Sequence, residues 1–319
     1  MNVAERLIRR VDTWQQRHTP IAFVVGVVKK YGDDNAGMLA ASLAHATFVA
    51  LFPLLLVLVT ILGIVAADHP AVRHDVLAAV TKQFPLIGQD LAGNVHQLRR
   101  SSVIGLIVGL LLATWGALGL AQSGMFTMAQ TWNLPGPQRP GYWQRLGRAA
   151  EFLGVLVCGV AVTTGLSSLS AFGHHLAVTV IGAEVVAAAA NVGMYLLGFR
   201  VLTPKAVPAK NLIAGAVIAG IAWTGLQAAG AVVVRHYLNT GSVYGIFGIV
   251  LSLLAWIYLV VQVTVYSAEV NVVLRRRLWP RSIVQPPLTD ADRVALNLLP
   301  LQNQRRQEQQ IDVSFTDRQ

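Results

Sequence analysis

Long stretches without charged side chains dominate the chain. Thirty consecutive residues, from Met38 to Ala67, contain no Asp, Glu, Lys or Arg, and only His45 among them can carry a charge. A soluble helix of this length would present a polar face, so the pattern predicts a helix within the hydrocarbon core of a bilayer. About 20 residues cross that core, which leaves room for a tilt or for a kink at Pro53.

Five further apolar runs follow the first. We therefore predict an all-α, polytopic membrane protein with six transmembrane helices. The predicted spans are residues 38–67, 102–124, 149–173, 177–200, 211–234 and 245–274. This divides the chain into a cytoplasmic segment 1–37, a transmembrane domain 38–274 that includes the extracytoplasmic segment 68–100, and a tail 275–319 that is basic and then polar.

Composition agrees with a membrane protein, and the distribution of charge predicts its orientation. Charged residues make up 13% of the chain, against about 25% in soluble domains. The net charge of +10 would also suit a nucleic-acid-binding protein. With the N-terminus inside, however, the inner segments near the membrane hold sixteen Lys and Arg residues and the outer ones five. The positive-inside rule then places both termini in the cytoplasm and accounts for most of the basic excess without nucleic acid.

The N-terminal segment has the pattern of an amphipathic helix. Val3, Leu7, Val11 and Trp14 recur at steps of four, four and three residues. Arg6, Arg9 and Arg17 fall outside this stripe. Such a pattern predicts a helix that lies in the plane of the membrane interface.

Three other segments outside the spans have distinct patterns. Residues 68–100 form the only long extracytoplasmic segment, which suits a helix over the outer mouth of the bundle or a plain surface helix. A short helix is expected to begin at Thr289, with Asp290 and Asp292 in its first turn. The Gln-rich residues 302–319 are expected to be disordered.

Polar side chains inside the predicted spans are the candidate functional residues, because each needs a partner or a water-filled cavity in hydrocarbon. They are His45, Glu184, Asn191, Gln227, Gln262, Glu269 and Asn271. Glu184 and Asn191 are seven residues apart, as are Gln262 and Glu269, so each pair shares a helix face. Two interpretations stay open: a polar interior for a solute, a lipid headgroup or a proton, or a set of buried interhelical hydrogen bonds.

Enzyme and metal motifs are not found. The chain has no H-E-x-x-H, G-x-S-x-G or Walker A sequence, and lone Cys158 excludes an intrachain disulfide. The pair His174–His175 has no third ligand nearby in sequence, so no metal site is expected. We predict a protein that is not an enzyme and needs no cofactor.

Two stretches carry a family resemblance: FVALFPLLLVLVTILG, residues 48–63, and SVYGIFGIVLSLLAWIYLVVQVTVYSAEVNVVL, residues 242–274. Together they resemble the YihY/virulence factor BrkB family, and in particular its YhjD-type inner-membrane proteins. The matching motif positions are Pro53, Tyr244, Gly245, Trp256, Tyr258, Glu269 and Asn271. The chain departs from the family at His45–Ala46 and Ala50, where members often carry aromatic residues and a serine, and His45 is a candidate to replace them.

The resemblance implies a multi-pass protein of the bacterial inner membrane. YhjD-type members have been linked by inference to lipid or lipopolysaccharide export, and the older family label ribonuclease BN is regarded as mistaken. We therefore predict transport of a lipid or small solute, with membrane lipids as partners and no nucleic acid. The alternative is a membrane scaffold for envelope assembly, and a ribonuclease is the least favoured. The sequence does not indicate the substrate or the oligomeric state.

Overall fold

A computed structural model describes residues 3–68, 103–171, 177–238 and 245–315, and every regular element in these ranges is a helix. The predicted outer segment 68–100 lies almost wholly outside them, as does Tyr244. The long helices are α3 (Ala36–Asp68), α6 (Val103–Thr131), α7 (Tyr142–Ala171), α8 (Ala177–Leu202), α9 (Ile213–Leu238) and α10 (Gly245–Arg276). The shorter ones are α1 (Val3–Arg17), α2 (Thr19–Asp33), α11 (Asp290–Leu301) and the 3-10 turns η2 (Gly136–Gln138) and η3 (Ala209–Leu212).

Each of the six predicted spans corresponds to one long helix, and five of the helices have the length and composition to cross a membrane. Their apolar stretches are Ala36–Leu55, Ile107–Thr131, Val185–Leu202, Ala209–Gln227 and Val250–Arg276. Helix α7 is 30 residues long but is not among the five, and its first turns carry Arg145, Arg148 and Glu151. The all-helical membrane fold is thus confirmed for the described residues, whereas the count of six and the orientation stay predictions.

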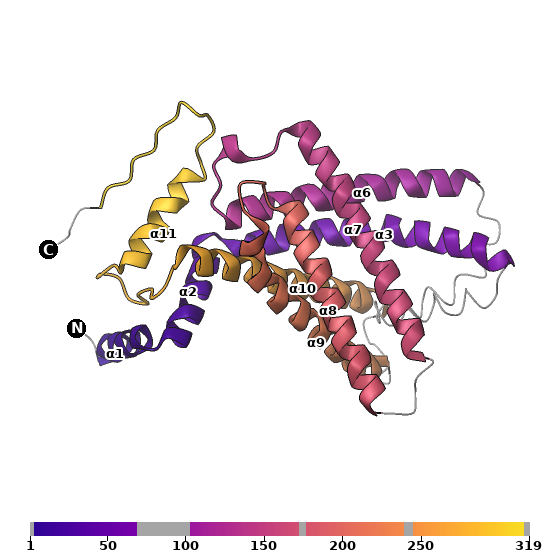
Figure 1. Cartoon of the computed structure of the whole chain (residues 1–319), viewed down its shortest axis with the longest axis horizontal. Coiled ribbons are helices and arrows are strands. Elements are labelled where there is room, and N and C mark those ends of the chain that lie inside the picture. Colours follow the sequence, from indigo (N-terminus) through magenta and orange to yellow (C-terminus); the bar gives the residue numbers. More distant parts are fainter. Residues whose placement is uncertain (1–2, 69–102, 172–176, 239–244, 316–319) are drawn as a thin grey trace.

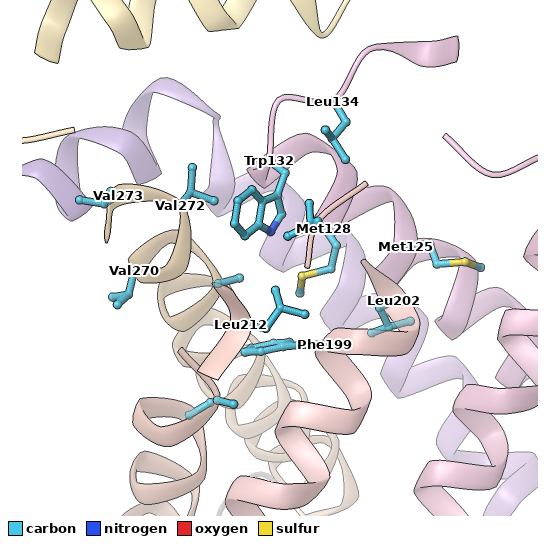
Figure 2. Close-up of a cluster of buried hydrophobic side chains, with 14 of the residues drawn as sticks. Met125, Met128, Trp132, Leu134, Phe199, Leu202, Leu212, Val270, Val272 and Val273 are labelled. Atoms are coloured by element: carbon cyan, nitrogen blue, oxygen red, sulfur yellow. The ribbon is translucent and has the colours of Figure 1, made fainter. Parts of the chain in front are cut away.

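The surface of the bundle is apolar. Leu111, Trp115 and Phe247 are exposed on α6 and α10, where water would be an unfavourable solvent for side chains of this size. One cluster of buried side chains lies toward the end of the bundle near α2 and includes Met128, Trp132 and Phe199 (Figure 2). Apolar residues therefore occupy both the inside and the outside of this bundle, as expected for a protein surrounded by lipid.

Small residues let the long helices approach closely. A Cβ added at Gly116 of α6 would lie 2.9 Å from the Cα atom of Ala50 in α3. A Cβ at Gly220 of α9 would lie 2.6 Å from Val192 Cγ2 and 2.7 Å from Val192 Cα in α8. Close contacts between small residues of this kind are typical of helices that pack against each other in a membrane.

Two of the glycines of α9, Gly220 and Gly225, give a matched test of this packing. We expect Gly220→Ala to destabilise the protein by about 1–3 kcal/mol, because the added methyl group overlaps the backbone of α8. We expect Gly225→Ala to be neutral or stabilising by up to about 1 kcal/mol, because nothing lies within 4 Å of its Cβ position and alanine favours a helix. Unfolding in detergent compares the two variants, and equal losses would contradict a close α8–α9 contact.

A layer of short helices lies at one end of the bundle. Helices α1, α2 and α11 gather there, so the first and last helices lie at the same end (Figure 1). Helix α11 begins as predicted, since Thr289 and Asp292 form a capping box. The predicted apolar stripe of α1 is exposed at Leu7, Val11 and Trp14, as an interfacial helix requires.

Helix α2 ends in a sharp turn that positions the candidate site. Pro20 lies in its first turn, where a proline is well tolerated. At the other end Asn35 has φ 51°, a left-handed conformation that terminates helices and that asparagine adopts more readily than most residues. Helix α3 begins directly afterwards at Ala36, so the last turn of α2 lies against the start of the first long apolar helix.

Candidate functional site

The last turn of α2 holds an ion pair inside the protein. Lys30 and Asp34 are four residues apart and hence on one face of the helix. The Lys30 side chain is only 1% exposed, and its ammonium group contacts the carboxylate of Asp34. The ammonium also donates a hydrogen bond to the carbonyl oxygen of Thr131, at the end of α6, over 3.0 Å.

A second carboxyl group reaches the same lysine from α10. Glu269 is 0% exposed, and its Oε2 atom lies 3.4 Å from Lys30 Nζ. Neither oxygen of Glu269 has a hydrogen-bond partner among the described residues. Asp34 is better satisfied, because Asn133 donates a 2.9 Å hydrogen bond to its Oδ1 atom.

The site thus gathers one cation and two carboxyl groups away from solvent. We call Lys30, Asp34 and Glu269 the buried ion cluster. Burying charges costs several kcal/mol per ion, and an apolar set of the same volume is often at least as stable. With Glu269 incompletely hydrogen-bonded, the cluster is poorly explained as a stabilising device alone. It has the chemistry of a site that binds or releases a charge.

Lys29 and Asp33, the second pair of charged residues on α2, face the C-terminal segment. Arg281 is buried, and its guanidinium group donates to Asp292 over 2.6 Å and to Asp33 over 2.7 Å. Lys29 lies 3.6 Å from Asp292 and donates to the carbonyl oxygen of Ser282. We call Lys29, Asp33, Arg281 and Asp292 the tail ion cluster, and it joins α2 to the segment that follows α10.

Hydrogen bonds lower the pKa of Asp292 in this cluster. Burial alone would raise its pKa, but donors from Arg281, Ser282 and Thr289 outweigh that effect and hold the pKa well below its ordinary value. Asp12 of α1 is similar: hydrogen bonds from the backbone of Ile283 and other donors overcome its burial and lower its pKa. Both carboxylates therefore stay ionised, and they fasten the C-terminal segment to α1 and α2.

The other candidate residues in the spans make local contacts between helices. Asn271 accepts a 2.7 Å hydrogen bond from the backbone N–H of Gly215 in α9. Asn191 of α8 donates to Thr224 of α9 over 3.1 Å. In these contacts the two asparagines act as interhelical hydrogen-bonding groups, the second of the interpretations that the sequence left open.

The remaining predicted positions do not join the buried ion cluster in the described contacts. His45 is exposed and Pro53 half-buried on α3, and Gln262 and Gln227 are half-buried on α10 and α9. The side chain of Gln262 lies near the hydroxyl group of Tyr31 in α2.

The family-motif positions on α10 have structural surroundings. Trp256 packs on Gly230 of α9, where an added Cβ would lie 2.9 Å from its ring. Tyr258 packs beside a buried cluster that joins α3 and α10. Gly245 begins α10. Glu184, a candidate residue of α8 that is not part of the family motif, has a side chain outside the described part of the chain.

Sequence reasoning missed Lys30, Asp34 and Asn133. The available signal was the sequence KKYGDD at residues 29–34, in which two Lys–Asp pairs repeat at a spacing of four. In the sequence this segment belongs to residues 1–37, where Lys29 and Lys30 count only among the basic residues that favour a cytoplasmic location. No group of three His, Cys, Asp or Glu side chains suitable for a metal ion occurs in the described ranges.

The fold and this site define a multi-pass α-helical membrane protein with a buried ion cluster at one end of its bundle. Comparison with known proteins gives the family. Residues 27–287 match the virulence factor BrkB family, and the chain belongs to it. The match includes Lys30, Asp34 and Glu269.

Several relatives are named as membrane proteins. The chain is 23% identical to a UPF0761 membrane protein of Pseudomonas paraeruginosa, over 90% of this chain and 70% of the relative. It is 20% identical to the inner membrane protein YhjD of Escherichia coli, over 79% of this chain and 81% of the relative. No solved structure matches the chain. The protein is therefore a multi-pass inner-membrane protein.

Proposed function

We propose that this protein moves a lipid or a small solute across the inner membrane, or assists that movement, without acting as an enzyme. The observation that carries the proposal is the buried ion cluster. Ionisable side chains at membrane depth commonly belong to transport pathways. Of the three residues, Glu269 lies within a span, on α10, and Lys30 and Asp34 reach it from the C-terminal end of α2, outside the spans.

Six spans with both termini in the cytoplasm are part of this proposal. The α6–α7 and α8–α9 connections are basic and lie close together, since Arg148 donates to the carbonyl oxygen of Thr203 over 3.1 Å. They lie at the end of the bundle that holds α1, α2 and α11 (Figure 1). A basic end that also carries the first and last helices supports a cytoplasmic assignment and an even number of spans.

The position of the cluster suggests how it acts. Lys30 and Asp34 belong to a short helix, whereas Glu269 belongs to a span, so the ion pair between Lys30 and Glu269 joins the cytoplasmic layer to the bundle. A change of charge on Glu269 alters the attraction between the two parts. A transporter needs such a contact, because its two states must differ in the free energy of specific interactions.

The transport rate of the Glu269→Gln variant tests the proposal. We expect the full-length protein in liposomes to move fluorescent phosphatidylglycerol, phosphatidylethanolamine or one of a panel of small solutes. Glutamine keeps the shape of Glu269 but removes its charge. A charge-assisted contact contributes about 1.5–3 kcal/mol, so we expect the rate to change by about tenfold or more.

The control is Glu151→Gln, which makes the same change at an exposed position of α7 and should leave the rate unchanged. Equal rates for the parent and Glu269→Gln would contradict a role of the cluster in transport. The absence of flux for every probe, together with specific partner proteins recovered by crosslinking in cells, would favour the scaffold function instead.

A further inference from the structure

A pocket lies at the same end of the bundle as α2. None of its lining residues belongs to the buried ion cluster. Its volume is about 230 Å³, and it is formed by the α6–α7 connection, the start of α7 and the residues after α8. The polar side chains in its lining are Gln138, Arg139, Gln144, Arg148 and Lys205, and the rest are three prolines and an alanine. Three of the lining residues are cationic and none is acidic.

Two of the three cations are held in place by neighbouring groups. Arg139 donates through Nε and Nη2 to the carbonyl oxygen of Leu134, each over 3.2 Å, and its guanidinium group lies 5.7 Å from the ring centroid of Phe126. Arg148 donates one hydrogen bond to Thr203. An arginine has five N–H donors, so both keep donors for a ligand.

These cations are also not neutralised by ion pairs. Within the ranges that the structure describes, no ion pair involves Arg139, Arg148 or Lys205. The carboxylate of Glu151, which does not line the pocket, attracts Arg148, whereas the positive charge of Arg200 repels it. A concave site with several fixed cations and no acidic lining attracts an anion.

The surroundings place this site at the level of a membrane interface. Tyr142 and Trp143 begin α7 next to the pocket and are 64% and 78% exposed. Their rings contact each other edge to face, with centroids 5.3 Å apart. Exposed aromatic pairs at the end of an apolar helix are typical of the headgroup region, and basic pockets between helices at this level suit anionic headgroups.

We propose that this pocket binds the phosphate group of an anionic phospholipid headgroup. The two guanidinium groups donate to the phosphate oxygens, a geometry that arginine favours. Lys205, which is exposed, adds a point charge from the other side. A free phosphorylated solute has the same chemistry, so the experiment must separate the two sources.

Two lysines in the α8–α9 connection give a matched test. Lys205 lines the pocket, whereas Lys210 of η3 is exposed at the same end and does not line it. Each basic residue near an anionic surface contributes enough for about a fivefold change in affinity. We expect Lys205→Gln to weaken binding of short-chain phosphatidylglycerol by about fivefold, and Lys210→Gln to leave it unchanged.

Binding is measured on the purified full-length protein in neutral detergent, by native mass spectrometry and by fluorescence of the lipid. Phosphatidylcholine serves as the zwitterionic comparison, and inorganic phosphate as the free-anion competitor. A second variant, Arg139→Gln, should weaken binding of phosphatidylglycerol at least as much as Lys205→Gln. Its folding is checked by thermal unfolding, since Arg139 also bonds to Leu134.

The outcomes separate the possibilities. Preference for phosphatidylglycerol over phosphatidylcholine, weakened by Lys205→Gln alone among the two lysine variants, supports the proposal. Equal weakening by both lysine variants would show a diffuse electrostatic attraction and overturn it. Binding of inorganic phosphate that depends on Lys205, with no preference between the lipids, would assign the pocket to a free anion and overturn the lipid assignment. None of these results depends on transport.

Discussion

We expect Lys30→Met to lower the free energy of unfolding by about 3–5 kcal/mol. The substitution leaves Asp34 and Glu269 buried together without their cation, and removal of one partner from a buried ion pair typically costs this much. The loss is measured by unfolding of the full-length protein in detergent, with intrinsic fluorescence as the readout.

The neighbouring lysine provides the control. Lys29→Met makes the same chemical change at a side chain that is 24% exposed, so we expect a loss of about 1 kcal/mol. Combining Lys30→Met with Glu269→Gln should recover part of the loss, because one of the two unpaired charges is then gone. A Lys30→Met variant as stable as Lys29→Met would mean that the cluster is not buried as described.

We expect Arg281→Gln to release the C-terminal layer from α2. The buried guanidinium group bonds to Asp33 and Asp292, and its removal leaves Asp292 without its strongest partner. The local free energy of opening should fall by about 3–5 kcal/mol. Hydrogen exchange at residues 290–301 measures it, since α11 is then free to detach and its amides lose protection.

Two comparisons accompany this variant. Arg275→Gln removes a charge from an exposed position and should leave the exchange of α11 unchanged. In the parent protein the lowered pKa of Asp292 means that its contribution is fully present above the ordinary carboxyl pKa and is lost only as the pH falls well below it. Protection of α11 that disappears already near pH 5 would contradict the strong hydrogen bonding of this carboxylate.

The long helices could be predicted from the sequence because continuous apolar runs leave few alternatives. The predicted span 177–200 corresponds to α8, Ala177–Leu202, and 245–274 corresponds to α10, Gly245–Arg276. The start of α7 at Tyr142 was missed, since its first turns carry charged residues that resemble a loop. Helix starts inside polar segments have no hydropathy signal, and only a cap such as that at Thr289 reveals them.

The candidate site could be predicted only in part. Glu269 is conspicuous as a carboxylate in an apolar run, so its importance follows from the cost of burying it. Its partner Lys30 lies in a polar segment that resembles a solvated surface. The contact of Arg281 with Asp33 joins residues 248 positions apart. Pairing between such distant residues depends on how the helices pack, which local patterns do not encode.

Helix α2 makes contacts of different kinds on adjacent faces. Lys29 and Asp33 bind the C-terminal layer, whereas Lys30 and Asp34 bind Glu269 and Asn133. Neighbouring residues of a helix are separated by about 100° of rotation. A rotation of α2 about its axis therefore displaces both sets of contacts together. Helix α2 therefore couples the layer of short helices to the helix bundle, and we expect a ligand that binds to one of the two parts to shift the position of the other.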